Sequence, residues 1–189
     1  MLRDISLHIL DLAQNSVTAG AETIEIVIEC DEKNEFLALS IKDNGCGMSA
    51  DFLASVTDPF TTSRTTRKVG MGIPFFKLAC EQAGGEFSIS SVLKEGTELK
   101  GSLAVENIDR LPLGNVGSSV TSLILSAPQI RFLVTLKSAK GEFCFDTEAV
   151  KEEIGEVPIT EYEILQWTEK YINENVQIIF GGVLNEIIS

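Results

Sequence analysis

Asp11 and Asn15 lie four residues apart near the start of the chain, in a segment with the apolar periodicity of a helix. This spacing places both side chains on one helical face, about 6 Å apart along the axis. A carboxylate and a carboxamide in this arrangement can bind one hydrated magnesium ion between them. Such an ion calls for a ligand that carries phosphate groups.

A glycine-containing stretch, DNGCGM, occupies residues 43–48, directly after a segment of alternating apolar residues. At the end of a strand, the Asp43 carboxylate can accept a hydrogen bond from an adenine amino group, while Gly45 and Gly47 let the backbone approach the ring. A buried charge-assisted hydrogen bond of this kind contributes roughly 1.5–3 kcal/mol, or about ten- to a hundredfold in affinity. Asn-Gly is also a common tight-turn signature, so this stretch alone leaves a simple turn open.

Glycines and bases further along the chain suit an anionic ligand. Gly70 and Gly72 precede a predicted helix, where backbone N–H groups and the helix N-terminus can bind phosphate oxygens. Residues 58–69 are predicted to form a long polar loop before them, and a loop of this length in a compact domain is more often a lid than a spacer. Arg64, Arg67 and Lys68 cluster in this segment, and one of them can neutralise charge at a terminal phosphate. A solvated loop surface and an ordinary helix start are the alternatives.

The order of these stretches along the chain is itself informative. An acid-x-x-x-Asn helix is followed by Asp-x-Gly-x-Gly after a strand, Pro-Phe-Thr-Thr, Gly-x-Gly into a helix, and Gly-Thr into a strand. This order resembles the GHKL ATPase superfamily, which groups DNA gyrase, heat-shock chaperones, sensor histidine kinases and the mismatch-repair MutL proteins. The resemblance covers residues from about 5 to about 105. It implies a two-layer α/β sandwich, the Bergerat or histidine-kinase-like ATPase fold, with ATP and magnesium as ligands.

The resemblance also implies a role for individual residues. Asn15 would be the magnesium ligand that bridges to the phosphates, and Asp11 would be the catalytic carboxylate. Asp43 would bind adenine, and Thr97 would support it from the following strand. The full set of implied nucleotide-binding residues is Asn15, Asp43, Gly45, Gly47, Met48, Phe60, Thr61, Thr62, Arg64, Lys68, Gly70, Gly72 and Thr97.

Two branches of the family contribute to the resemblance, and this leaves the reaction open. NSVTAGA and DNGCGM are similar to the MutL branch, whereas DPFTTS and the residues after it are similar to histidine kinases and anti-sigma-factor kinases. Hydrolysing members commonly carry glutamate where this chain has Asp11, whose shorter side chain alters the geometry for activating water. An acid in the kinase branch can instead orient the metal or accept a proton from a protein hydroxyl. Three activities follow: transfer of the γ-phosphate to a partner protein, slow ATP hydrolysis that drives a conformational switch, or sensing of ATP without turnover.

The only histidine, His8, lies one helical turn before Asp11. We find no dimerising helical hairpin that bears a phosphoacceptor histidine, so autophosphorylation of the histidine-kinase type is not expected. A packed or capping histidine is the predicted role of His8. Phosphotransfer, if it occurs, is then expected on a separate protein.

Alternating and helical patterns define the elements that must position these residues. A polar turn joins two predicted strands in the first part of the chain. A proline-interrupted stretch at 107–113 suggests a linker between an ATP-binding domain, 1–106, and a small α+β domain, 114–189.

The sequence TEYE predicts that a last helix starts at Thr160 with a capping box. The segment from 177 on can be a strand, a helix or a partner-binding tail. The remaining expectations in the first unit are strands at 22–30, 36–43, 86–90 and 97–105 and helices at 50–56 and 73–85. In the second unit they are a helix at 115–125, a hairpin at 130–147, a helix at 148–154, and a core-facing stripe of Ile164, Trp167, Thr168, Tyr171 and Ile172 on the last helix.

Composition narrows the class of protein. The 189 residues are 44% hydrophobic, with a formal charge of −13 that disfavours nucleic acid as a partner. Four separated cysteines form no Cys-x-x-Cys pair, which argues against a zinc site or a disulfide framework. Without a long apolar run or a secretory leader pattern, the expected location is the cytoplasm, with no membrane partner. A partner protein is expected to bind through 114–189, and a homodimer is left open.

Overall fold

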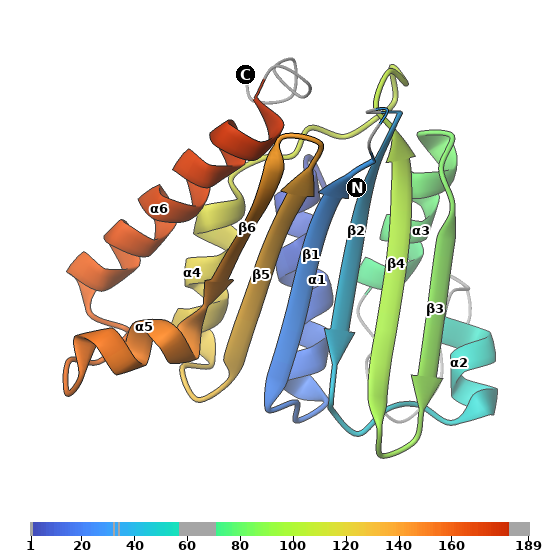
Figure 1. Ribbon diagram of the computed structural model, residues 1–189. Helices are drawn as coiled ribbons and strands as arrows, with labels where there is room; N and C mark the ends of the chain where they lie inside the picture. The colour runs from blue at the N-terminus through green and yellow to red at the C-terminus, as the bar shows by residue number, and fades with distance from the viewer. Residues whose placement is uncertain (1, 32, 34, 57–70, 182–189) are drawn as a thin grey trace.

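A computed structural model describes residues 2–31, 33, 35–56 and 71–181. Within these ranges, six strands form one mixed sheet in the order β3-β4-β2-β1-β5-β6. Figure 1 shows helices α1, α3 and α4 side by side behind this sheet, and α6 beyond α4 at the β6 end. The strands are β1 Thr23–Cys30, β2 Phe36–Asp43, β3 Phe87–Val92, β4 Gly96–Ala104, β5 Arg131–Ser138 and β6 Gly141–Asp146; the helices are α1 Ile5–Thr18, α2 Ala50–Val56, α3 Gly72–Gln82, α4 Val116–Ser126, α5 Thr147–Ile154 and α6 Tyr162–Phe180.

Alternation in the sequence explains the two layers. In β1 every second residue is buried, from Ile24 to Cys30, and the antiparallel pairing of β1 with β2 sets Ile26 opposite Ile41. These side chains all point to the helical layer, because successive residues of a strand face opposite sides of the sheet. The α/β fold expected from the sequence is confirmed.

Strand β5 joins the same sheet as the first four strands. It runs parallel to β1, with Ile26 opposite Val134, and its buried residues Phe132, Val134 and Leu136 belong to the same apolar core as β1 and β2. The segment at 107–113 is hydrogen bonded to the start of α1, where Ile5 N–H donates to the Pro112 carbonyl at 2.8 Å. Residues 114–180 therefore continue the sheet and the core of residues 5–105, because the open edge of β1 offers the hydrogen bonds that β5 needs.

Helix α6 differs from its predicted form in two respects. It begins at Tyr162 and has no side-chain cap, so the capping box expected at Thr160 does not form. Its buried stripe includes Thr168 and Ile172, as predicted, but Trp167 and Tyr171 are 48% and 38% exposed. The expectation that these two aromatic residues are core was wrong, because Val176, Ile179 and Phe180 extend the buried stripe along a different line of the helix.

No helix in the described part of the chain combines the length and the apolar character needed to cross a membrane.

Candidate functional site

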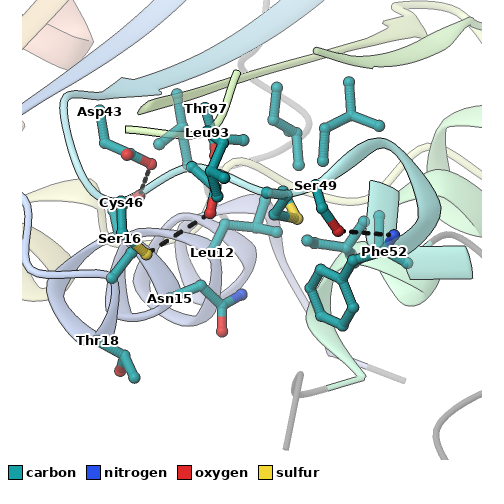
Figure 2. Close-up of a pocket in the computed structure, with 18 residues that line it drawn as sticks. Leu12, Asn15, Ser16, Thr18, Asp43, Cys46, Ser49, Phe52, Leu93 and Thr97 are labelled. Carbon is teal, nitrogen blue, oxygen red and sulfur yellow. Dashed lines mark hydrogen bonds between the residues drawn. The ribbon is translucent and has the colours of Figure 1, made fainter. Parts of the chain in front are cut away.

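A cavity of about 630 Å³ opens between α1, the loop after β2, α2 and the β3–β4 hairpin (Figure 2). Its walls are mostly apolar, with a few polar side chains, as is common for small-molecule sites. Asp43 and Thr97 lie on one side of the view in Figure 2 and Asn15 on the other. The lining residues are Leu12, Asn15, Ser16, Thr18, Ala19, Ile41, Asp43, Cys46, Gly47, Met48, Ser49, Phe52, Val56, Ile73, Ile89, Leu93, Thr97 and Leu99.

Asp43 is a buried acid with a fixed orientation. It is the last residue of β2 and only 8% exposed. Ser16 Oγ on α1 donates to Oδ2 at 2.6 Å, and Gly45 N–H donates to Oδ1 at 2.9 Å. Two donors, one on each carboxylate oxygen, hold the plane of the carboxylate. Each carboxylate oxygen has lone pairs left to accept a further hydrogen bond from a ligand.

Gly47 and Gly96 allow the glycine-containing loop to lie directly on the β3–β4 hairpin. Gly47 has φ +62°, and a Cβ there would lie 2.0 Å from the Val92 carbonyl oxygen. Gly96 has φ +124°, and a Cβ there would lie 1.9 Å from the Asp43 carbonyl oxygen. Both positions therefore require glycine for backbone packing. Gly45 contributes its N–H to Asp43 and does not line the cavity.

Ser91 links the loop to the start of β4. Its Oγ accepts from the Met48 N–H at 2.8 Å, donates to the Gly96 carbonyl at 2.9 Å, and lies 2.9 Å from Thr97 Oγ1 in a third hydrogen bond. Ser91 and Thr97 are also opposite each other in the β3–β4 register. Thr97 and Met48, both predicted to contact the nucleotide, are thus held together by a side chain that the sequence analysis did not select.

Asn15 lines the cavity, as the magnesium-site hypothesis requires. Its Nδ2 atom is buried, and no group in the described residues makes a hydrogen bond to it. An unsatisfied carboxamide at a cavity wall fits a site that a ligand completes, and its oxygen is a ligand type that magnesium prefers. The described residues contain no cluster of three or more His, Cys, Asp or Glu side chains that could hold a metal ion. A magnesium ion at Asn15 would therefore depend on phosphate oxygens and water.

Asp11 belongs to α1, and its side chain lies against Gly72, the first residue of α3. Asp11 is not among the residues that line the cavity. A Cβ on Gly72 would lie 2.2 Å from Asp11 Oδ2, so the carboxylate packs directly against this glycine. The side chain is exposed, and a carboxylate at a helix N-terminus is electrostatically favourable. The structure thus brings together Asp11 and Gly72, two predicted site residues that are far apart in the sequence.

Some of the predicted site residues lie in the segment that the structure does not describe. These are Phe60, Thr61, Thr62, Arg64, Lys68 and Gly70, all outside the described residues.

His8 is packed, as predicted. Its side chain is fully buried on α1, its ring centroid lies 5.4 Å from that of Phe76 on α3, and neither ring nitrogen has a hydrogen-bond partner within the described ranges. Burial lowers the pKa of His8 to about 4, with the nearby Asp4 carboxylate opposing the shift. The imidazole is therefore neutral near pH 7 and has no accessible nitrogen to accept a phosphoryl group.

Several lining residues were not predicted. Ser16 directly follows Asn15, but only the fold shows that it reaches Asp43. Ile41 and Ile89 follow the strand alternation toward the helical layer, and that signal could have selected them. Leu93 is 57% exposed at the hairpin and lines the cavity, and no local pattern distinguishes it from a turn residue.

The family of this chain follows from a sequence-family comparison. The model of the histidine kinase-, DNA gyrase B- and HSP90-like ATPase family matches residues 2–107. The chain belongs to this family. A sensor protein from Shewanella frigidimarina is 36% identical to this ATPase-family chain over 94 residues, which is 49% of this chain and 14% of the relative.

Two further comparisons agree with this assignment. The sensor protein SrrB of Staphylococcus aureus is 38% identical over 78 residues, 39% of this chain and 13% of the relative. The chain thus spans only about a seventh of the length of the curated relatives it matches. The crystal structure of the N-terminal domain of a DNA repair protein has a TM-score of 0.52 at 16% identity, covering 76% of this chain and 52% of that chain, and it shares the fold.

Proposed function

We propose that this ATPase-family member binds magnesium and ATP in the cavity and transfers the γ-phosphoryl group to a hydroxyl of a separate protein. The buried Asp43 carboxylate carries the nucleotide part of the proposal. Ser16 and Gly45 already orient this carboxylate at the cavity wall, and its free lone pairs suit the amino group of adenine. Guanine presents a carbonyl where adenine has this amino group, so the same carboxylate would repel it.

The metal part of the proposal rests on Asn15. Its carboxamide oxygen would hold magnesium from the α1 side of the cavity, whose wall Asn15 lines. The buried Nδ2 atom, which has no partner among the described residues, is a donor that would suit a phosphate oxygen. Magnesium in such a site neutralises charge on the phosphates during transfer. The protein's own contribution is the orientation of the carboxamide on a rigid helix.

Asp11 is the proposed proton acceptor. The acceptor hydroxyl oxygen would form a bond to the γ-phosphorus as the bond from phosphorus to the β–γ bridging oxygen breaks and ADP leaves. The hydroxyl proton would pass to the Asp11 carboxylate. The Asp11 side chain is exposed where it lies against the first residue of α3, so a hydroxyl group of another protein could reach it. The burial of His8 further supports an acceptor outside this chain.

The test follows the label of γ-labelled ATP in the presence of magnesium. The purified protein is incubated alone and with an extract of the source cells, and label is measured in ATP, in free phosphate and in protein bands. Asp43→Asn is the control without a functional adenine site, and Asp11→Asn is the control that keeps nucleotide binding. We expect label in an extract protein with the wild type and with neither variant.

Two outcomes would contradict the proposal. Free phosphate released by the wild type alone, and lost in Asp11→Asn, would make the protein an ATPase. ATP that is bound but remains intact with and without extract would make it a sensor.

A further inference from the structure

Helix α6 carries a second apolar stripe beside the one that packs on the core. We define the outer α6 stripe as Trp167, Tyr171 and Ile178. These residues recur at intervals of four and seven, so they lie along one side of the helix. Trp167, Tyr171 and Ile178 are 48%, 38% and 64% exposed. A surface helix usually presents polar residues on its outer side, so this stripe needs an explanation other than the core.

The aromatic rings of the stripe are held in place by one another. The Trp167 and Tyr171 rings are stacked, with centroids 4.9 Å apart and an interplanar angle of 15°. Tyr171 also meets Phe143 of β6 edge to face, with centroids 5.2 Å apart. Rings ordered before binding lose little conformational entropy when a partner covers them. Tryptophan and tyrosine are also the residues that most often dominate binding energy at interfaces.

Acidic residues surround this stripe in the sequence. Between Gly141 and Gly181 the chain carries ten acidic residues and only two basic ones. Glu163 and Glu174 lie next to the stripe on the helical wheel, and Lys170 is 3.7 Å from Glu174. A second copy of this chain, with a formal charge of −13, would bring like charges together. A basic partner would instead meet complementary charge.

We propose that the outer α6 stripe docks a basic amphipathic helix of another protein. The stripe extends over 12 residues, about 17 Å of helix, and a linear row of apolar side chains matches the apolar face of a second helix. Lysine or arginine beside that face would meet Glu163 and Glu174. Docking at α6 does not depend on phosphotransfer, because the residues that line the cavity all precede α4 in the sequence and none of them belongs to α6.

Trp167 makes the test direct, because it is the only tryptophan of the chain. Its emission is recorded while a synthetic helical peptide of leucine and lysine, with the leucines on one face, is titrated into the full-length protein. A peptide of the same composition with scattered leucines measures attraction by charge alone. We expect a blue shift and at least about tenfold tighter binding for the amphipathic peptide.

Two variants and one matched control locate the surface. Tyr171→Ala keeps the reporter and should weaken binding about tenfold. Glu163→Lys with Glu174→Lys should weaken it to a similar extent and reduce its dependence on salt. Ile108→Ser removes an apolar side chain that is 96% exposed outside α6, and should leave the peptide affinity unchanged. Circular dichroism and ATP binding verify that each variant is folded.

Other outcomes would overturn the proposal. Equal binding of both peptides would show attraction by charge alone. A blue shift that grows with protein concentration in the absence of peptide would assign the stripe to a second copy. A red shift on deletion of residues 182–189 would assign it to the chain's own terminus. Since ATP binding is measured separately, failure of the docking proposal and failure of the proposed nucleotide function are distinguishable.

Discussion

The two ends of the sheet depart from the usual distribution of polar and apolar residues in opposite ways. At the cavity end, Asp43 and Ser16 are buried polar groups. At the α6 end, Trp167 and Tyr171 are large apolar groups on the surface. A buried polar group costs stability unless a partner satisfies it, and an exposed aromatic group gains stability when a partner covers it. The two proposals follow this contrast: the polar groups at the cavity end suit a polar small molecule, and the aromatic groups at the α6 end suit an apolar face of a partner.

The two ends nevertheless share one sheet and one apolar core. Strands β1 and β5 are adjacent and parallel, and their buried residues share a single core. We therefore expect mutations at either end to affect stability globally, while effects on ligand binding stay local.

The largest effect is expected at the contact between the glycine-containing loop and the hairpin. In Gly47→Ala, a Cβ would lie 2.0 Å from the Val92 carbonyl oxygen in addition to the strain of a positive φ. We expect the free energy of unfolding to fall by about 2–4 kcal/mol and ATP affinity to fall with it. Gly20→Ala is the matched control, because Gly20 has φ +74° but no atom within 4 Å of its Cβ position. It should cost only about 1–2 kcal/mol in urea unfolding, and an equal loss in both variants would refute the role of the contact.

The next effect is the dependence of stability on pH at His8. Its pKa is about 4 in the folded protein, against the ordinary histidine pKa of 6.5 in the unfolded chain. Above pH 6.5 both states are neutral and the contribution is fully present. As the pH falls from 6.5, the unfolded state binds the proton first, so the free energy of unfolding falls by about 1.4 kcal/mol per pH unit until about pH 4. The expected total is roughly 3 kcal/mol.

Urea unfolding across this pH range checks the prediction. His8→Met removes the titrating group while keeping an apolar side chain of similar size beside Phe76. The difference in the free energy of unfolding between wild type and His8→Met should change with pH below 6.5 and become constant above it. A pH dependence that is the same in both proteins would show that carboxylates alone cause it.

A smaller effect is expected at Ser16, and it separates the ends of the sheet. Ser16→Ala removes the donor to Asp43 Oδ2, so we expect about a fivefold to tenfold loss of ATP affinity from one hydrogen bond. Ser119→Ala on α4 is the matched control, because Ser119 Oγ is buried and donates to the Ser6 carbonyl at 2.7 Å. Both variants should lose a similar amount of stability, about 1 kcal/mol. Only Ser16→Ala should weaken ATP binding, as measured by isothermal titration calorimetry. Equal affinities would contradict the positioning role of Ser16.

The smallest effect on nucleotide binding is expected at the α6 end. Tyr171→Ala should leave ATP affinity unchanged, because no residue of α6 lines the cavity. Its own stability cost should stay near that of the two aromatic contacts that Tyr171 makes, with Trp167 and with Phe143, at about 0.5–1.5 kcal/mol each. A change of ATP affinity beyond about twofold would mean that the two ends are coupled through the shared core.

Comparison of residues shows which parts of the site were predictable. Asp43, Gly47 and Thr97 follow from short motifs at strand ends, and the structure places them together at the hairpin and the cavity. Ser16 and Ser91 carry no motif of their own, because their roles depend on partners 27 and six residues away that only the folded sheet brings within hydrogen-bond distance. Asp11 was predicted beside Asn15, but its carboxylate lies against Gly72 because α1 and α3 pack together.

The sequence by itself determined the local structure and the family of this protein. Alternating isoleucines predict β1 and β2, and the ordered motifs from Asp11 to Thr97 indicate the ATPase family, because side-chain periodicity and turn chemistry act over a few residues. The tertiary structure decided that β5 extends the first sheet and that Trp167 and Tyr171 face solvent. Both outcomes depend on which surfaces meet. Helix α6 has two apolar faces, and only one of them packs on the core. Which one does so depends on the rest of the fold and cannot be read from the sequence of the helix alone.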